Sequence, residues 1–181
     1  MLLVCLGVKS RVPTLLHVIP SQGKGNVSAV TSLGDNVFVV RDRSEQIEVY
    51  DAETFALQRH IAVPGLDSCH LGLAVCAVNH CMYASDWNSS IVHRVKLSGS
   101  NAVKKWSVAR RPAGLSVNKA HNLVVACCGA NKLQEYTTHG CIVREICLQA
   151  GLAHPRHAIQ LSTGDFVVSH SGDLVLSLIH I

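Results

Sequence analysis

Cysteine and histidine give this chain its most evident chemical potential, because its 181 residues include eight of the first and eleven of the second. Five of them gather in one short stretch: Cys69, His70, Cys76, His80 and Cys81. A structural zinc ion requires two ligand pairs, with about two to four residues between the members of a pair. The cysteines here lie seven and five residues apart. We therefore expect no metal site and no cofactor.

The other cysteines fit a protein interior better than a catalytic centre. Cys127 and Cys128 are adjacent, and neighbouring residues on a strand point to opposite faces. Free cysteine behaves as a small buried hydrophobe. Thiols that fill the core favour a reducing compartment, so we predict a cytoplasmic protein.

Nucleophilic catalysis has little support in the sequence. A strained serine turn of the hydrolase type needs a G-x-S-x-G motif, and none occurs. His17, His60 and His93 fall on predicted strands, where a single histidine is usually a structural residue with its hydrogen bonds satisfied. We predict that the protein is not an enzyme.

The elements that would position these residues are clearest in residues 112–148. Four short apolar runs occur there, separated by turns that contain Gly, Asn and Thr: 114–117, 122–126, 132–136 and 142–148. Runs of about four to seven residues with period-two character, punctuated by Gly and Asn, predict strands joined by hairpins. The stretch is therefore predicted to be a four-stranded antiparallel meander.

The same pattern recurs along the chain. Asp42 and Asp86 lie 44 residues apart, and Cys128 and His170 follow at steps of 42. The matching third-strand residues are expected to be Ile47, Ile91, Leu133 and Val175. A four-stranded repeat of about 40–45 residues is the signature of a β-propeller blade. The predicted fold class is all-β, a partial propeller of four-stranded antiparallel blades.

These repeats resemble those of the NHL family, including the tripartite-motif proteins and NHL-type propellers of marine invertebrates. Residues 82–86 followed by 91–95 match the family pattern best, and residues 38–42 with 47–51 are close to it. The third and fourth copies have Cys128 and His170 in place of the aspartate. The resemblance covers residues 15–175 and implies a propeller of six blades, of which about four are present.

We expect the chain to be a fragment of such a propeller, because six blades of this period need about 250 residues. Residues 1–14 are an unassigned leader, too short to span a membrane. Residues 15–175 hold the partial propeller. Residues 176–181 match the translation of a sequencing-adapter end, so we expect a non-native tail there.

Strand alternation places the loops after the second and fourth strands of every blade on one face of the predicted disc. Binding residues concentrate on loops that a rigid scaffold holds. The ligand-binding residues predicted on this face are Lys24, Arg41, Arg43, Trp87, Asn88, Arg110, Arg111, Lys132 and Arg156. Asp42 and Asp86 are expected to cap backbone amides of their own turns.

The resemblance implies an interaction scaffold that binds a protein partner through this face, as in the substrate-recognition part of a ubiquitin ligase. NHL propellers also bind RNA, so RNA is an alternative partner, with Lys and Arg on phosphates and Trp87 stacked on a base. A third alternative is a propeller hydrolase or lyase with its metal site in missing blades, because the inner strands here hold almost no carboxylate. We predict no membrane partner and no small-molecule substrate.

Overall fold

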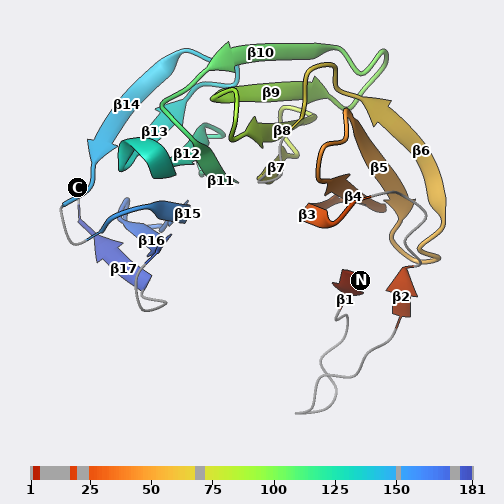
Figure 1. Cartoon of the computed structure of the whole chain (residues 1–181), viewed down its shortest axis with the longest axis horizontal. Helices are drawn as coiled ribbons and strands as arrows, with labels where there is room; N and C mark the ends of the chain where they lie inside the picture. Colours follow the sequence, from red (N-terminus) through yellow and green to blue (C-terminus); the bar gives the residue numbers. More distant parts are fainter. Residues whose placement is uncertain are drawn as a thin grey trace.

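The computed structural model describes residues 2–4, 17–19, 25–67, 72–149, 152–171 and 176–180. Four successive antiparallel sheets stand side by side as an open arc around a common centre (Figure 1). The predicted all-β propeller is confirmed. In these residues no helix has the length and apolar character needed to cross a membrane.

The first three blades contain four strands each, in chain order. Blade 1 comprises β3 (Val27–Leu33), β4 (Asn36–Arg41), β5 (Gln46–Asp51) and β6 (Leu57–Ala62). Blade 2 comprises β7 (Leu73–Cys76), β8 (Cys81–Asp86), β9 (Ile91–Lys96) and β10 (Val103–Ser107). Blade 3 comprises β11 (Pro112–Val117), β12 (Leu123–Cys127), the single 3-10 turn η1 (Cys128–Ala130), β13 (Lys132–Tyr136) and β14 (Ile142–Cys147).

Blade 4 has three described strands: β15 (Pro155–Gln160), β16 (Phe166–His170) and β17 (Leu176–Ile179). The segment expected to be a non-native tail thus forms β17, which pairs with β16. This pairing does not bear on the origin of the segment, and the expectation stays a prediction. Two further strands, β1 (Leu2–Val4) and β2 (His17–Ile19), pair with each other, so the leader contributes a strand.

The hydrophobic core lies between the blades. One cluster joins blades 1 and 2 through Ile47, Ile61 and Met82, and a second joins blades 2 and 3 through Tyr83 and Leu123. A third cluster lies between blades 3 and 4. The middle strands are buried on both faces, which explains why β4, β8 and β12 read as continuous apolar runs instead of alternating patterns.

The inner strands β3, β7, β11 and β15 approach one another around the centre of the arc, and two glycines permit this approach (Figure 1). A Cβ on Gly72 would lie 2.3 Å from the carbonyl oxygen of Ala113 on the next blade. A Cβ on Gly114 would lie 2.4 Å from the carbonyl oxygen of Arg156. Both positions therefore require glycine for the observed spacing.

The third strand of blade 2 departs from the predicted register. Val40 pairs with Ile47 and Ala126 with Leu133, and six residues separate the members of each pair. Ala84 pairs with His93, and eight residues separate them. The longer hairpin makes His93, and not Ile91, the equivalent of Ile47 and Leu133. In blade 4 the corresponding partner of Val168 is Ser177, while Val175 lies outside the described residues.

His93 consequently occupies a slot that blades 1 and 3 fill with aliphatic side chains. It is 1% exposed, and neither ring nitrogen has a hydrogen-bond partner among the described residues. The expectation of a satisfied structural histidine is therefore wrong at this position. Burial lowers the pKa of His93; Lys105 lowers it further and Asp86 opposes the shift. The imidazole is neutral in the folded protein at neutral pH.

We predict that His93→Leu stabilises the protein. At pH 7 the free energy of unfolding should rise by about 1–2 kcal/mol, because two buried unpaired nitrogens are removed. The folded state holds the His93 pKa below its unfolded value, so wild type should lose stability as the pH falls below about 6.5. His93→Leu should lack that component. Urea unfolding from pH 7.5 to 5 measures both, and the exposed His139→Leu serves as control. A destabilised His93→Leu variant at pH 7 would contradict the assignment.

Blade 4 also presents an apolar row on the side turned away from blade 3. Ile159 pairs with Val167, which pairs with Leu178, so their side chains share one face. Ile159 is 45% exposed, Leu178 is 53% exposed and Leu176 is 69% exposed. Strand β17 is the edge of its three-stranded sheet in the described chain. Such an edge beside apolar side chains promotes association.

The chain expressed alone should therefore self-associate. Sedimentation velocity should show a weight-average mass that grows with concentration, and Leu178→Glu should shift the population toward monomer. Val78→Glu, at an exposed residue of the β7–β8 turn, should leave it unchanged. A wild-type chain that is a monodisperse monomer at all concentrations would refute this expectation.

Candidate functional site

Hydrogen bonds between loops build a surface at the same end of blades 1, 2 and 3. The amide of Val63 donates to the carbonyl of Glu45, and that of Val108 donates to Ser90. The amide of Leu148 donates to Asn131 in the same way. Each bond joins the loop after a fourth strand to the loop after a second strand. The predicted common face is therefore confirmed; we call residues 42–45, 63–67, 87–90, 108–111, 128–131 and 152–154 the loop face.

The two aspartates at the ends of the second strands behave differently. The carboxylate of Asp86 accepts hydrogen bonds from the amides of Asn88 at 2.9 Å and Ser89 at 3.1 Å. The predicted cap is thus present in blade 2. Asp42 instead accepts a hydrogen bond from the Ser28 hydroxyl on the inner strand. The Asp42 carboxylate consequently faces the centre of the arc.

Several residues predicted to bind a ligand are engaged within the blades. The Arg41 Nε donates to Glu48 at 2.8 Å, and both side chains are buried. Burial alone would raise the pKa of Glu48, yet the hydrogen bonds from Arg41 and Tyr50 hold it below its usual value. The Lys132 Nζ lies 3.0 Å from Glu145 in the same blade.

Two further predicted residues add little to an open site. The side-chain amide of Asn88 lies 3.5 Å from the carbonyl of Asp67 and thereby joins two loops. Lys24 lies outside the described residues. Of the nine predicted residues, four arginines and Trp87 therefore define what the loop face can offer.

These four arginines share one property. Arg43, Arg110, Arg111 and Arg156 are exposed, and none forms an ion pair with an acidic side chain of the described residues. Arg156 lies on β15, beside the loop face. Uncompensated positive charges therefore lie after the second strand of blade 1, in the connection between blades 2 and 3, and on blade 4.

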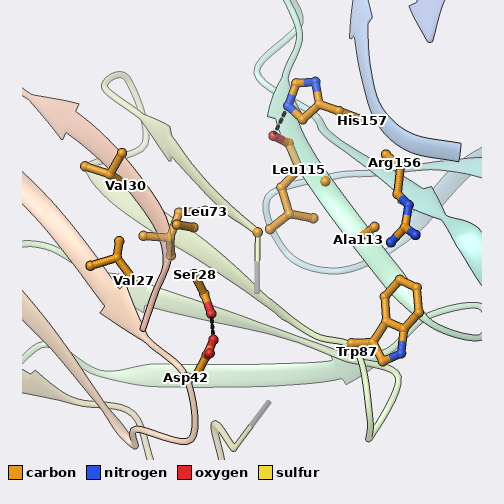
Figure 2. A pocket seen from close by; sticks show the side chains of 13 residues that line it. Val27, Ser28, Val30, Asp42, Leu73, Trp87, Ala113, Leu115, Arg156 and His157 are labelled. Carbon is orange, nitrogen blue, oxygen red and sulfur yellow. Dashed lines mark hydrogen bonds between the residues drawn. The ribbon is translucent and has the colours of Figure 1, made fainter. Parts of the chain in front are cut away.

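Two of the arginines converge on the indole of Trp87. The guanidinium carbon of Arg111 lies 5.8 Å from the ring centroid, and that of Arg156 lies 5.6 Å from it. Figure 2 shows the Arg156 side chain extended along the inner strands toward Trp87. Guanidinium groups at this distance interact favourably with the π-face of an indole. The three side chains come from blade 2, from the connection between blades 2 and 3, and from blade 4.

A cleft of about 550 Å³ opens beside this cluster, at the centre of the arc. All four inner strands line it, with Val30, Leu73 and Leu115 among its apolar residues and Asp42 and His157 among its polar ones (Figure 2). The His157 Nε2 lies 3.1 Å from the carbonyl oxygen of Leu115. Asp42 and Arg156 thus place opposite charges on opposite sides of the cleft.

Few side chains in the part of the chain that the structure describes could bind a metal ion. No group of three His, Cys, Asp or Glu side chains there could hold a metal ion. Cys76 and Cys81 are buried free thiols, and Cys69 and His70 lie outside the described residues. Burial raises the pKa of the Cys127 thiol to about 12, so this cysteine is an inert core residue.

Sequence reasoning missed the convergence on Trp87, because Arg156 and Trp87 belong to blades that are not neighbours. A signal was present in the small residues between them. Ala113 and Gly114 on the inner strand β11 and Gly129 in η1 have no bulky side chain. Ser171 was also missed, although its hydroxyl accepts a hydrogen bond from the Arg156 Nε at 2.9 Å.

Comparisons with known proteins identify the fold. No protein-family profile matches the chain, and no curated protein matches it in sequence. Virginiamycin B lyase from Staphylococcus aureus matches with a TM-score of 0.71 and 12% identity, over 90% of this chain and 58% of the lyase. The WD40 β-propeller domain of Doa1 matches with a TM-score of 0.68 and 12% identity, over 87% and 51% of the two chains.

Hydrazine synthase from Kuenenia stuttgartiensis is similar to the same extent. It matches with a TM-score of 0.70 and 20% identity, over 90% of this chain and 48% of the synthase. The chain thus spans about half to three fifths of the length of these structures. Similarity at such low identity establishes architecture alone: this chain has the β-propeller fold.

Proposed function

We propose that this chain is a non-enzymatic interaction module that binds an acidic protein partner through its loop face. The observation that carries the proposal is the set of exposed, uncompensated arginines on and beside the loop face, two of which, Arg111 and Arg156, lie over the ring of Trp87; the other two are Arg43 and Arg110. Trp and Arg supply most of the energetic anchors at protein interfaces. Uncompensated positive charge steers an acidic surface toward them and fixes its orientation.

The surrounding acids support this reading. Glu45 accepts a hydrogen bond from the Gly65 amide at 2.8 Å, and Asp86 caps its own turn. Their carboxylates are directed into the loops, whereas the guanidinium groups of Arg43 and Arg110 are exposed. Asp67 is also exposed on the loop face, but the exposed arginines outnumber it, so a partner that approaches meets an excess of positive charge.

RNA is the less favoured partner. An exposed base would have to stack on Trp87, whose ring already interacts with two guanidinium groups. Arg41 and Lys132, which were expected to hold phosphates, are paired with glutamates within their blades. A continuous track of phosphate contacts, as single strands require, is thereby interrupted.

The resemblance to NHL repeats extends the proposal to the substrate-recognition part of a ubiquitin ligase. In that role the acidic partner would be the ligase substrate. This extension depends on the repeat resemblance, whereas the choice of an acidic partner depends on the arginines.

Charge reversal tests the proposal. A fluorescent decaglutamate peptide should bind the chain at low salt, and Arg110→Glu or Arg111→Glu should weaken binding about fivefold to tenfold, because each reversal replaces attraction by repulsion. Lys104→Glu, on the outer strand β10, is the matched control and should have little effect. Equal weakening by all three variants, or binding of decauridine RNA in preference to the peptide, would overturn the proposal.

A further inference from the structure

We propose that Arg111 and Arg156, held beside Trp87, form a binding site for a phosphate monoester such as phosphoserine on the partner. This inference rests on the proposed function and names the group that the site recognises. The ligand class follows from four features of the cluster: its fixed geometry, its open approach, its charge and its lack of an internal counter-ion.

Hydrogen bonds hold the backbone of Arg111 and the side chain of Arg156. The Ser90 hydroxyl accepts a hydrogen bond from the Arg111 amide at 3.3 Å, and the Arg111 carbonyl accepts one from the Cys128 amide at 3.0 Å. The Arg156 Nε donates to Ser171 at 2.9 Å. This bond orients the guanidinium and leaves its terminal nitrogens available. A site that is ordered before the ligand arrives loses less entropy on binding.

The approach to the cluster is open because blade 3 is small at this point. The Arg156 side chain extends past Ala113 toward Trp87 (Figure 2). A Cβ on Gly129 would lie 3.0 Å from the side chain of Arg111, so the absence of a side chain there leaves room for that arginine. Both guanidinium groups therefore reach one indole, Arg111 from the connection between blades 2 and 3 and Arg156 from blade 4.

The combined charge of the two guanidinium groups favours a phosphate monoester over anions that carry a single charge. Two guanidinium groups present about two positive charges, and a phosphate monoester carries about −1.5 to −2 at pH 7 with three acceptor oxygens. A carboxylate or an RNA phosphodiester carries about one negative charge and compensates only half of the pair. One arginine can also bind two phosphate oxygens at once, so the three oxygens of a phosphate monoester can contact both guanidinium groups.

No described side chain supplies the missing negative charge. Neither arginine has an ion-pair partner among the described residues. The nearby Cys128 is buried, and burial raises the pKa of its thiol despite the opposing effect of Arg156 and Arg111. The thiol therefore stays protonated and neutral. Asp42, the acid that lines the same cleft, is bonded to Ser28 on the other side (Figure 2).

The two tryptophans of the chain allow a direct test. In ¹⁵N-labelled protein the indole N–H signal of Trp87 should shift on addition of phenyl phosphate. The signal of Trp106, which packs between Tyr83 and Tyr136 in blades 2 and 3, should not move. Benzenesulfonate, a monoanion of similar shape, should bind at least fivefold more weakly. Lowering the pH from 7.5 to 5 should weaken phenyl phosphate binding, because the phosphate loses charge near pH 6.

Substitutions test which arginines bind the phosphate. Arg111→Gln and Arg156→Gln should each weaken phenyl phosphate binding about tenfold, as expected for a lost charge-assisted contact. Arg59→Gln, at an exposed arginine of the outer strand β6 away from the loop face, is the control and should be close to wild type. An unchanged Trp106 signal verifies that each variant is folded. The absence of a Trp87 shift, equal binding of sulfonate and phosphate, or equal losses in all three variants would overturn the site.

A second arm identifies the source of the phosphate. A short acidic peptide with a central phosphoserine should bind at least tenfold more tightly than its serine counterpart and more tightly than inorganic phosphate. Inorganic phosphate that binds as tightly as the phosphopeptide would refute a protein-borne ligand. If decaglutamate binds but phosphorylation adds nothing, the phosphate site fails while the proposed function stands. If phenyl phosphate binds but no acidic peptide does, the proposed function fails.

Discussion

Each blade is a thin sheet with two apolar faces, and only a neighbouring blade can cover them. Three of the four core clusters lie at the three blade–blade contacts and the fourth lies within blade 1, so much of the hydrophobic stabilisation belongs to pairs of blades. This explains why the middle strands are buried on both sides. It also explains why Gly72 and Gly114 are needed, since the inner strands must approach until a Cβ would collide with the next backbone.

Buried polar groups are also arranged by the packing of each blade against its neighbour. Glu135 is 4% exposed and accepts hydrogen bonds from Asn118 at 2.8 Å and Arg144 at 2.7 Å. Asn118 also donates to Gln160 on blade 4, so a buried carboxylate helps to join two blades. His93, by contrast, is buried without a hydrogen-bond partner among the described residues, because it occupies a position that blades 1 and 3 fill with aliphatic side chains. The buried carboxylates Glu48 and Glu135 are thus paired with arginines, while the charges of Arg43, Arg110 and Arg111, unpaired among the described residues, lie on the loop face, where water and ligands have access.

The period of the sequence was enough to predict strand order, the common face of the loops and the cap at Asp86. These features depend on residues that are close in sequence and on the alternation of strand directions. The length of each second hairpin was not predictable from the period. An insertion of two residues preserves the inward and outward alternation of side chains and therefore leaves the pattern of apolar residues intact. The mistaken equivalence of Ile91 with Ile47 arose in this way.

The features of the binding site likewise fall into those that the local sequence predicts and those that depend on the tertiary structure. The sequence by itself determined the all-β repeat, the identity of the loop residues and the excess of arginine among them. Only the tertiary structure decided that Arg41 and Lys132 are paired within blades while Arg111 and Arg156 meet at Trp87. The physical reason is that local pattern fixes strands and turns, whereas the curvature of the arc sets which blades bring their side chains together. Arg156 and Trp87 are 69 residues apart in the sequence and meet because the inner strands of three blades converge.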